Sequence, residues 1–378
     1  MDGVECDYDT GHVIGLDLGS SFLYGSIDSI SSLFQLHNLT RLNLSDNDFN
    51  GSEIPYAIGN LNQIPYRFGN LTRLTILDLG SNGFWCTPVP QSVFTPTKLE
   101  FLDLVNNYLS GTYNLGSFLN LTNLKVLELS GNKFSLVTTP VMSAIVPKFI
   151  VLTLGSCNLI EFPDFLMGFH QPAVVPPWTN LRVLELSSNN LQGSLPVPPA
   201  SIYHYSVSNN LLTGEISSMI CKLSSISVID LSNNSFSGTL PPCLGTLSKS
   251  LSVLNLQNNN FRGPIPQACE KGSKLREIDL SQNHGLIPTS LANCNMLEFL
   301  NLGNKQFEDT FPSLLGKLQQ LKVIILRHNG FHGAIGKPKS NEFPRLRIFD
   351  LSFNKFEGGL PSHHFRRWKA MKVVDLGN

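Results

Sequence analysis

The side chains that could support catalysis or metal binding are few, and their spacing does not bring them together. His328 and His332 stand four residues apart, a spacing that on a helix would offer two imidazole ligands to a zinc ion. The Asn-Gly pair between them indicates a turn instead of a helix. The histidine pair at 363–364 follows a Leu-Pro step and is expected on a solvated surface. We therefore predict that the protein is not an enzyme and holds no metal ion and no cofactor.

Carboxylates recur in the sequence without forming a motif of their own. Nine acidic residues share one position of a longer repeat: Asp17, Asp78, Asp103, Glu128, Glu185, Asp230, Asp279, Asp350 and Asp375. If each ends a strand of one sheet, the set is either a solvated polar strip or an acidic track for a basic or amide-rich ligand. Carboxylates on adjacent strands repel one another unless water surrounds them. The solvated strip is the favoured interpretation.

The composition is biased toward two residue types. The 378 residues include 59 Leu and 35 Asn, and charged residues make up 15% with a net charge of −1. This near-neutral balance excludes a basic surface for nucleic acid and a polybasic patch for membranes. No run reaches the roughly 18 apolar residues that a membrane span requires. Such a bias indicates an internal repeat.

The repeat is LxxLxLxxN, with a usual step of 24 or 25 residues. Its fifteen starts are Val13, Leu39, Leu74, Leu99, Leu124, Phe149, Leu181, Ile202, Ile226, Leu251, Leu275, Leu297, Leu321, Leu346 and Met371. Apolar residues that alternate at the fourth and sixth positions predict one short strand per copy. The expected fold class is an α/β solenoid, a leucine-rich repeat superhelix of about 15 repeats with a concave parallel β-sheet and an irregular convex side.

The Asn at the ninth position of the repeat is expected to turn inward. Its amide can donate to and accept from backbone groups that the turn leaves unpaired, so we predict a structural ladder and not a binding site. Cys157 and Ser21 replace this Asn with small groups, whereas Lys305 replaces it with a charge. The Asn is kept at Asn47, Asn82, Asn107, Asn132, Asn189, Asn210, Asn234, Asn259, Asn283, Asn329 and Asn354.

The residues after the ladder Asn carry a resemblance to a known family. GxIP or a near relative stands at 193–196, 238–241 and 263–266. The full pattern LxxLxLxxNxLxGxIP resembles the plant-specific class of leucine-rich repeat, found in receptor-like kinases, receptor-like proteins and polygalacturonase-inhibiting proteins. Residues 33–55 and 180–368 resemble, more narrowly, the receptor-like proteins of the Cf disease-resistance type.

That resemblance implies a ligand-recognition ectodomain in plant defence. It implies an extracellular protein, peptide or glycan ligand on the concave face, a partner receptor kinase, and a position on the extracellular side of the plasma membrane for the full-length parent. The chain shows no signal peptide and no transmembrane segment, so a membrane would be reached only through an absent C-terminal segment. The alternatives are a soluble secreted inhibitor of a cell-wall-degrading enzyme and a truncated, nonfunctional gene product.

The domain organisation follows from the same resemblance. Residues 1–12 are interpreted as the remnant of a Cys-bearing N-terminal cap and residues 13–378 as the solenoid, with the C-terminal cap, transmembrane and tail segments absent. The repeat is irregular at 52–73 and 160–180. The first irregularity repeats Ile-Pro-Tyr and Gly-Asn-Leu after ten residues, which indicates either a lost rung or a loop insertion.

The cysteines and sequons fit an extracellular chain. Seven Cys is an odd number. Cys221 and Cys243 lie about one repeat apart and are a candidate disulfide, while Cys294 is expected to be a small buried side chain. The glycosylation sequons are Asn38, Asn43, Asn50, Asn70, Asn120 and Asn233.

Ligand contacts are expected where a strand departs from the generic repeat. Aromatic and basic side chains on the concave side are the residue types that dominate binding energy. Together with acidic residues of the strip, the candidate ligand-binding residues are Phe101, Asp103, Glu128, Glu185, His204, Asp230, Asp279, Phe299, Arg327, His328 and Phe353.

Overall fold

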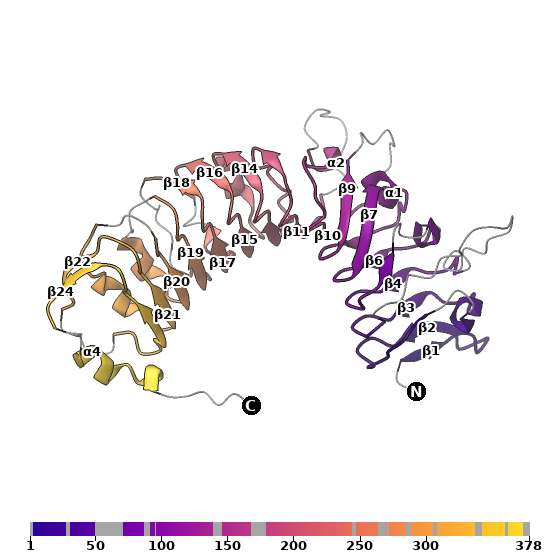
Figure 1. The fold of residues 1–378 in the computed structure, drawn as a ribbon, viewed down its shortest axis with the longest axis horizontal. Coiled ribbons are helices and arrows are strands. Elements are labelled where there is room, and N and C mark those ends of the chain that lie inside the picture. The colour runs from indigo at the N-terminus through magenta and orange to yellow at the C-terminus, as the bar shows by residue number, and fades with distance from the viewer. Residues whose placement is uncertain are drawn as a thin grey trace. The chain divides into compact units, whose positions relative to one another are not determined.

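The structure is a computed structural model that describes residues 3–27, 31–49, 71–86, 91–94, 96–138, 146–167, 179–243, 247–263, 269, 272–284, 289–304, 308–336, 342–359 and 362–372. The chain forms two compact units, residues 1–191 and 192–378. Both are built from short turns of chain that each contribute one strand to a parallel sheet (Figure 1).

In the first unit the described strands of this main sheet follow one another in chain order. They are β1 (Val4–Cys6), β2 (Val13–Asp17), β3 (Arg41–Asn43), β4 (Ile76–Asp78), β6 (Phe101–Asp103), β8 (Val126–Glu128), β10 (Val151–Thr153) and β11 (Val183–Glu185). β1 is antiparallel to β2, and the later strands are parallel. Pairing is in register, so that Leu77 of β4 lies opposite Leu102 of β6.

The main sheet of the second unit repeats this arrangement. Its described strands are β13 (His204–Ser206), β15 (Val228–Asp230), β17 (Val253–Asn255), β19 (Glu277–Asp279), β20 (Phe299–Asn301), β21 (Val323–Ile325) and β23 (Ile348–Asp350). All are parallel, and Ile229 of β15 lies opposite Leu254 of β17. The strand expected from the start at Met371 lies outside the described residues.

Shorter elements form the rest of each turn. The additional strands are β5 (Trp85–Cys86), β7 (Tyr108–Asn114) and β9 (Lys133–Val137) in the first unit, and β12 (Gln192–Gly193), β14 (Leu211–Gly214), β16 (Ser235–Gly238), β18 (Asn260–Phe261), β22 (His332–Ala334) and β24 (Lys355–Glu357) in the second. The helices are η1 (Ser32–Gln35), η3 (Gln91–Phe94), α1 (Leu115–Leu119), α2 (Asp164–Met167), η4 (Ser218–Lys222), η5 (Thr289–Asn293), η6 (Ser313–Lys317), α4 (Ser362–Arg367) and η7 (Lys369–Lys372).

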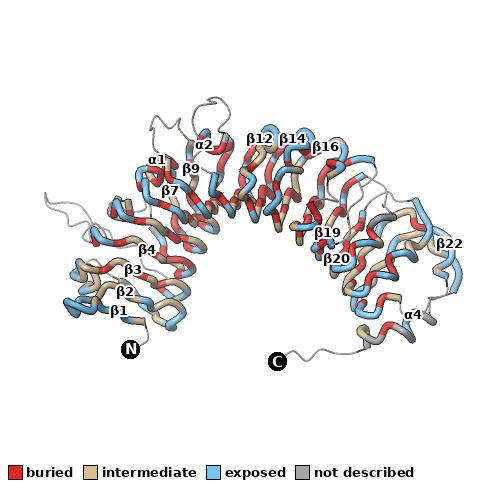
Figure 2. Tube along the Cα trace, turned by 180° about the vertical axis from the view of Figure 1, so that it is seen from behind, coloured by how far each residue is buried: buried red, intermediate tan, exposed pale blue. Residues whose placement is uncertain are grey.

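The core is a column of leucines inside the turns. Leu39, Leu42 and Leu44, at the first, fourth and sixth positions of one repeat, are all buried, and most of the described turns bury the same three positions (Figure 2). A single turn cannot enclose these side chains, so each turn covers its neighbour. The predicted solenoid is confirmed in both units.

The predicted Asn ladder is also confirmed. The Nδ2 of Asn82 donates to the carbonyl oxygens of Leu79 and Gly80 at 3.1 and 3.0 Å and to that of Leu44 on the preceding turn at 2.9 Å. Its Oδ1 accepts from the backbone N–H of Asn47 at 3.2 Å. All eleven ladder residues donate to the carbonyl three residues before them.

The two long steps of the repeat leave the sheet register intact. β3 pairs directly with β4 across a separation of 35 residues, and β10 pairs with β11 across 32 residues. Cys157 fills its ladder slot as a buried thiol whose backbone N–H donates to the Oδ1 of Asn189. Residues 50–70, most of the first irregularity, lie outside the described residues, as does Lys305.

Candidate functional site

The solvent side of the main sheet carries two rows of side chains, which we call the sheet face. Side chains alternate along a strand, so the third and fifth repeat positions share the side opposite the buried fourth. In β8, Leu127 is fully buried whereas Val126 and Glu128 are partly exposed. The sheet face therefore consists of the first and last residue of each three-residue strand.

The third-position row is largely apolar. The predicted candidates Phe101, His204 and Phe299 occupy it in β6, β13 and β20, and each is partly exposed. Most of their neighbours in this row are Val or Ile. Aromatic and imidazole rings thus interrupt an aliphatic row at these strands, as expected of contact residues.

Three carboxylates stand on consecutive strands at the fifth position of the first unit. Asp78, Asp103 and Glu128 are neighbours in the register of β4, β6 and β8. Burial, followed by the charges of Glu128 and Asp78, raises the pKa of Asp103 to about 7. Asp103 is only 9% exposed and accepts from the backbone N–H of Val105 at 2.7 Å. The pKa values of Asp78 and Glu128 are raised as well, mainly by burial.

This carboxylate triad, Asp78, Asp103 and Glu128, corrects the expectation of a solvated strip. Asp103 is nearly inaccessible to water, and burial favours its neutral form. Protonated Asp103 donates to the carboxylate of Glu128, which removes the repulsion that separate charges would feel. In this part of the sheet the raised pKa of Asp103 lowers the charge that the three acids carry below pH 7.

Fifth-position acids of the second unit are held differently. Asp230 accepts from the backbone N–H and the hydroxyl of Ser232 at 3.0 and 2.7 Å, and Asp279 makes the same two bonds with Ser281 at 2.9 and 2.7 Å. In addition, the Nδ2 of Asn301 donates to the second oxygen of Asp279 at 2.9 Å. These carboxylates are satisfied by hydroxyl and amide donors.

Glu185, the last predicted acid of the first unit, accepts from the backbone N–H of Ser187 at 2.7 Å. Asp375 lies outside the described residues. The eleven predicted contact residues thus all lie on or directly beside the main sheets, but they form no single cluster. They comprise two members of the carboxylate triad, the third-position rings, the fifth-position acids Glu185, Asp230 and Asp279, and a group beyond β21 and β23.

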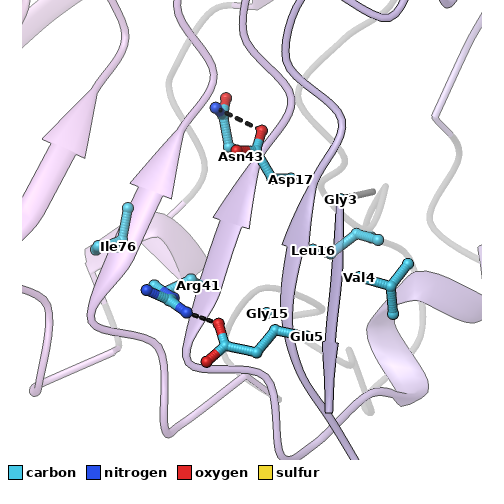
Figure 3. A pocket seen from close by; sticks show the side chains of 9 residues that line it. All are labelled: Gly3, Val4, Glu5, Gly15, Leu16, Asp17, Arg41, Asn43 and Ile76. Carbon is cyan, nitrogen blue, oxygen red and sulfur yellow. Dashed lines mark hydrogen bonds and ion pairs between the residues drawn. The ribbon is translucent and has the colours of Figure 1, made fainter. Parts of the chain in front are cut away.

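A hollow of about 440 Å³ opens on the sheet face at the N-terminal end, and sequence reasoning missed it. Glu5 of β1 forms an ion pair with Arg41 of β3 across Gly15, and Asn43 donates to Asp17 at 2.9 Å (Figure 3). A Cβ at Gly15 would stand 2.9 Å from the Glu5 Oε2, so a larger residue there would require the Glu5 side chain to shift. The available signal was that Gly15 is the one glycine at the third position among the fifteen repeats.

A basic and aromatic group lies just beyond β21 and β23. The rings of His328 and Phe353 stack with centroids 4.1 Å apart and planes inclined by 18°. The Arg327 Nε donates to the Nδ1 of His328 at 3.4 Å, and its Nη1 lies 3.8 Å from the Oδ2 of Asp350. Arg327 and His328 contribute to lowering the pKa of Asp350, together with hydrogen bonds from Ser352. We call Arg327, His328 and Phe353 the stacked platform.

The cysteines form two disulfides in the second unit. Cys221 is bonded to Cys243, with Cα atoms 5.6 Å apart. Cys294 is bonded to Cys269, which corrects the expectation of a free buried side chain. Cys294 is indeed fully buried, but its position on a turn next to that of Cys269 brings the two sulfurs together. Cys6 is an exposed free thiol, and burial raises the pKa of the Cys157 thiol to about 12.

The described sequons differ in how freely they could carry a glycan. Asn120 is exposed at the C-terminal end of α1. By contrast, the Nδ2 of Asn43 donates to Asp17, and that of Asn233 donates to the Oδ1 of Asn209. Asn38 accepts from Arg73. Asn50 and Asn70 lie outside the described residues, and glycosylation at all six remains a prediction.

Within the described ranges, no helix is long and apolar enough to span a bilayer. The same part of the chain contains no cluster of three or more His, Cys, Asp or Glu side chains with the geometry of a metal site.

Comparison with known proteins identifies a repeat family in the sequence and finds similar plant proteins. The family model Leucine Rich Repeat matches residues 38–61, 180–202, 225–247 and 250–271. Receptor-like protein 35 of Arabidopsis thaliana is 35% identical over 331 residues, covering 80% of this chain and 34% of that protein. Receptor-like protein 54 of the same plant is 31% identical, covering 98% of this chain and 62% of that protein. The chain thus spans between about a third and three fifths of these relatives.

Solved structures show the same fold. The crystal structure of PEPR1-AtPEP1 aligns with a TM-score of 0.70 and 25% identity, over 93% of this chain and 53% of that one. The Arabidopsis receptor kinase HAESA, in complex with the peptide hormone IDA and the co-receptor SERK1, aligns with a TM-score of 0.68 and 27% identity, over 94% of this chain and 64% of that one.

Parallel sheets, buried leucine columns and an Asn ladder define a leucine-rich-repeat protein. Within that class, the chain belongs to the plant receptor-like proteins. The relatives of the chain are leucine-rich-repeat receptor proteins, a non-enzymatic family.

Proposed function

We propose that this chain is a ligand-recognition region of a plant receptor-like protein and that its ligand binds on the sheet face. The observation that supports this most directly is a division of labour within each turn. The leucine column and the Asn ladder stabilise the fold. The sheet face carries acids, rings and guanidinium groups that take part in neither the column nor the ladder. Side chains of these kinds on a rigid scaffold are suited to binding.

A peptide or protein is the favoured ligand class, and a glycan is the alternative. The complex of HAESA with a peptide hormone and a co-receptor supports both a peptide ligand and a partner receptor kinase for the present chain. We further propose that the parent protein acts in defence, on the extracellular side of the plasma membrane, through such a kinase. Ligand-dependent co-precipitation of the full-length receptor with a receptor kinase from plant membranes tests this part.

A glycan placed on the sheet face tests where the ligand binds. The change Gln257→Ser creates a sequon at Asn255, whose side chain lies on the sheet face of β17. The matched control Arg262→Ser creates a sequon at Asn260 on β18, outside the main sheet. Both variants are secreted from a plant host, and glycan occupancy is confirmed by mass shift.

Peptides selected from a random display library on the unsubstituted chain are the probe. We expect the glycan at Asn255 to abolish their binding and the glycan at Asn260 to leave it within about twofold, because only the first blocks the sheet face. Binding that survives at Asn255 but is lost at Asn260 would move the site to another surface and overturn the proposal.

A further inference from the structure

The stacked platform departs from the repeat at a position that otherwise never carries a ring. The eighth repeat position has positive φ in each described turn. In twelve turns it holds a small or polar residue: Ser20, Asp46, Ser81, Asn106, Gly131, Ser156, Ser188, Asn209, Asn233, Asn258, Gln282 and Asn304. In the last two described turns it holds His328 and Phe353, with φ of 51° and 56°.

A bulky side chain at positive φ is unfavourable, whereas Asn and Gly tolerate it. Backbone strain of this kind is concentrated at sites where the side chain has a function. Here a ring stands at positive φ in two successive turns, whose strands β21 and β23 pair in register. The register brings the two rings together, so the pair forms a surface that neither departure would form alone.

The rings are stacked, yet they are not buried. Phe353 is 68% exposed, in contrast to Phe331 and Phe343, which are fully buried in the same unit. A core role would have removed Phe353 from water. The stack instead presents a ring to solvent, where it offers an area on which another ring can pack.

A guanidinium lies beside this ring and is only weakly held. The two contacts of Arg327, to His328 at 3.4 Å and to Asp350 at 3.8 Å, are both long. Ser352 holds the Oδ1 of Asp350, to which it donates through its N–H at 3.0 Å and its hydroxyl at 2.6 Å, so that only Oδ2 faces Arg327. Within the described part of the chain, no group accepts from the Nη2 of Arg327. The guanidinium of Arg327 can therefore bind both oxygens of a ligand carboxylate.

We propose that the stacked platform binds a peptide segment in which an aromatic side chain stands next to an Asp or Glu. The aromatic ring packs on Phe353, and the neighbouring carboxylate is bound by Arg327. This inference rests on the proposed function and names the ligand chemistry at one end of the second unit. A neutral sugar ring could stack on Phe353 but would offer no anion to the guanidinium, so the charge favours the peptide.

Substitution by the residue that the repeat prefers separates binding from folding. Phe353→Asn and His328→Asn place an amide at a positive φ that Asn adopts readily. Both variants should melt at the same temperature as the unsubstituted chain or higher, so a loss of binding cannot be due to unfolding. Gln282→Asn, at the same repeat position but away from the platform, is the matched control, and Arg327→Gln removes the charge alone.

Peptides are selected from a random display library on the full chain and measured by fluorescence anisotropy. We expect aromatic-acid pairs to be enriched, and affinity to fall about tenfold or more with Phe353→Asn and with Arg327→Gln but less than about twofold with Gln282→Asn. Selected peptides without the pair, or with affinity unchanged by Phe353→Asn, would overturn the inference. If the glycan at Asn255 still blocks peptides that do not depend on Phe353, the proposed function stands and only the inference about the stacked platform fails. Phe353-dependent binding of an uncharged oligosaccharide on a glycan array would also overturn the peptide assignment.

Discussion

The carboxylate triad of the first unit and the fifth-position acids of the second unit solve the same electrostatic problem in different ways. In the first unit, Asp78, Asp103 and Glu128 stand on consecutive strands, and burial raises the pKa of Asp103 to about 7, so that the acid ionises only as the pH approaches neutrality. In the second, Asp279 has an amide neighbour in Asn301, which donates to it. The same repeat position can therefore hold either a proton-sharing cluster or a set of fixed charges, depending on the residue one strand away.

The seventh position reinforces this difference. In the second unit the acids of β15, β19 and β23 each receive a hydroxyl donor from the Ser two residues later, at 2.6 to 2.7 Å. In the first unit Asp78 and Asp103 are followed there by Gly80 and Val105, which offer only backbone N–H groups. A hydroxyl donor stabilises the charged form of an acid, and Asp103 receives none, so burial dominates its pKa.

The largest expected difference between the units is redox dependence. Both disulfides of the described residues lie in the second unit and close loops of 22 and 25 residues. Replacing Cys221 and Cys243 together by Ser should lower the stability of the second unit by about 3 kcal/mol. Hydrogen exchange measured by mass spectrometry should show lost protection in β14 to β18 and unchanged protection in β3 to β10. Equal loss in both units would mean that they unfold as one.

The next effect is the pH dependence of the first unit. The native pKa of Asp103 is about 7, above the value of about 3.9 in an unfolded chain, so its contribution to stability is complete below pH 4 and is lost as the pH rises to 7. Asp103→Asn should therefore stabilise the chain at pH 8 by about 2 kcal/mol, after allowance for residual solvent contact, and should have little effect at pH 4.

Urea unfolding at the two pH values measures this, with Asp230→Asn as the matched substitution in the second unit. Asp230 is already satisfied by Ser232, and its substitution should change stability by less than about 0.5 kcal/mol at either pH. A stabilisation by Asp103→Asn that is equal at pH 4 and pH 8 would show that the gain comes from packing and not from proton binding.

A carboxylate cluster can also be built into the second unit. Asn301→Asp removes the donor to Asp279 and places two acids on adjacent strands. The expected loss is about 1 kcal/mol at pH 8 and much less at pH 3, where both acids are protonated. Thermal melts at the two pH values provide the measurement, and a loss that is independent of pH would argue against charge as its cause.

The smallest effect should follow from giving Asp103 the hydroxyl that the second unit uses. Val105→Ser places a donor two residues after the acid, as Ser232 stands after Asp230. The pKa of Asp103 should fall by about one unit, read from the carboxyl carbon shift in an NMR titration. Val151→Ser, on the sheet face of β10, is the control and should leave this pKa unchanged.

Much of the fold could be predicted because each repeat obeys the same local physics. The Leu spacing determines which side chains are buried, and Asn47 or Asn82 has the same backbone groups to satisfy in every turn. Asp103 could not be predicted in this way, because its burial depends on side chains from two other strands. The disulfide between Cys269 and Cys294 could not be predicted either, because the spacing of cysteines in the sequence does not determine which of them pair.

The Asn ladder has a consequence for how such a chain can change over generations. Each amide joins its own turn to the one before it, and the bond between Asn47 and Asn82 forms across 35 residues as readily as others form across 25. The ladder sets how neighbouring turns align, and its hydrogen bonds do not depend on the number of residues between one ladder Asn and the next. Unequal recombination that exchanges complete turns therefore preserves folding while it reshuffles the sheet face, and recognition can diversify without a redesign of the scaffold.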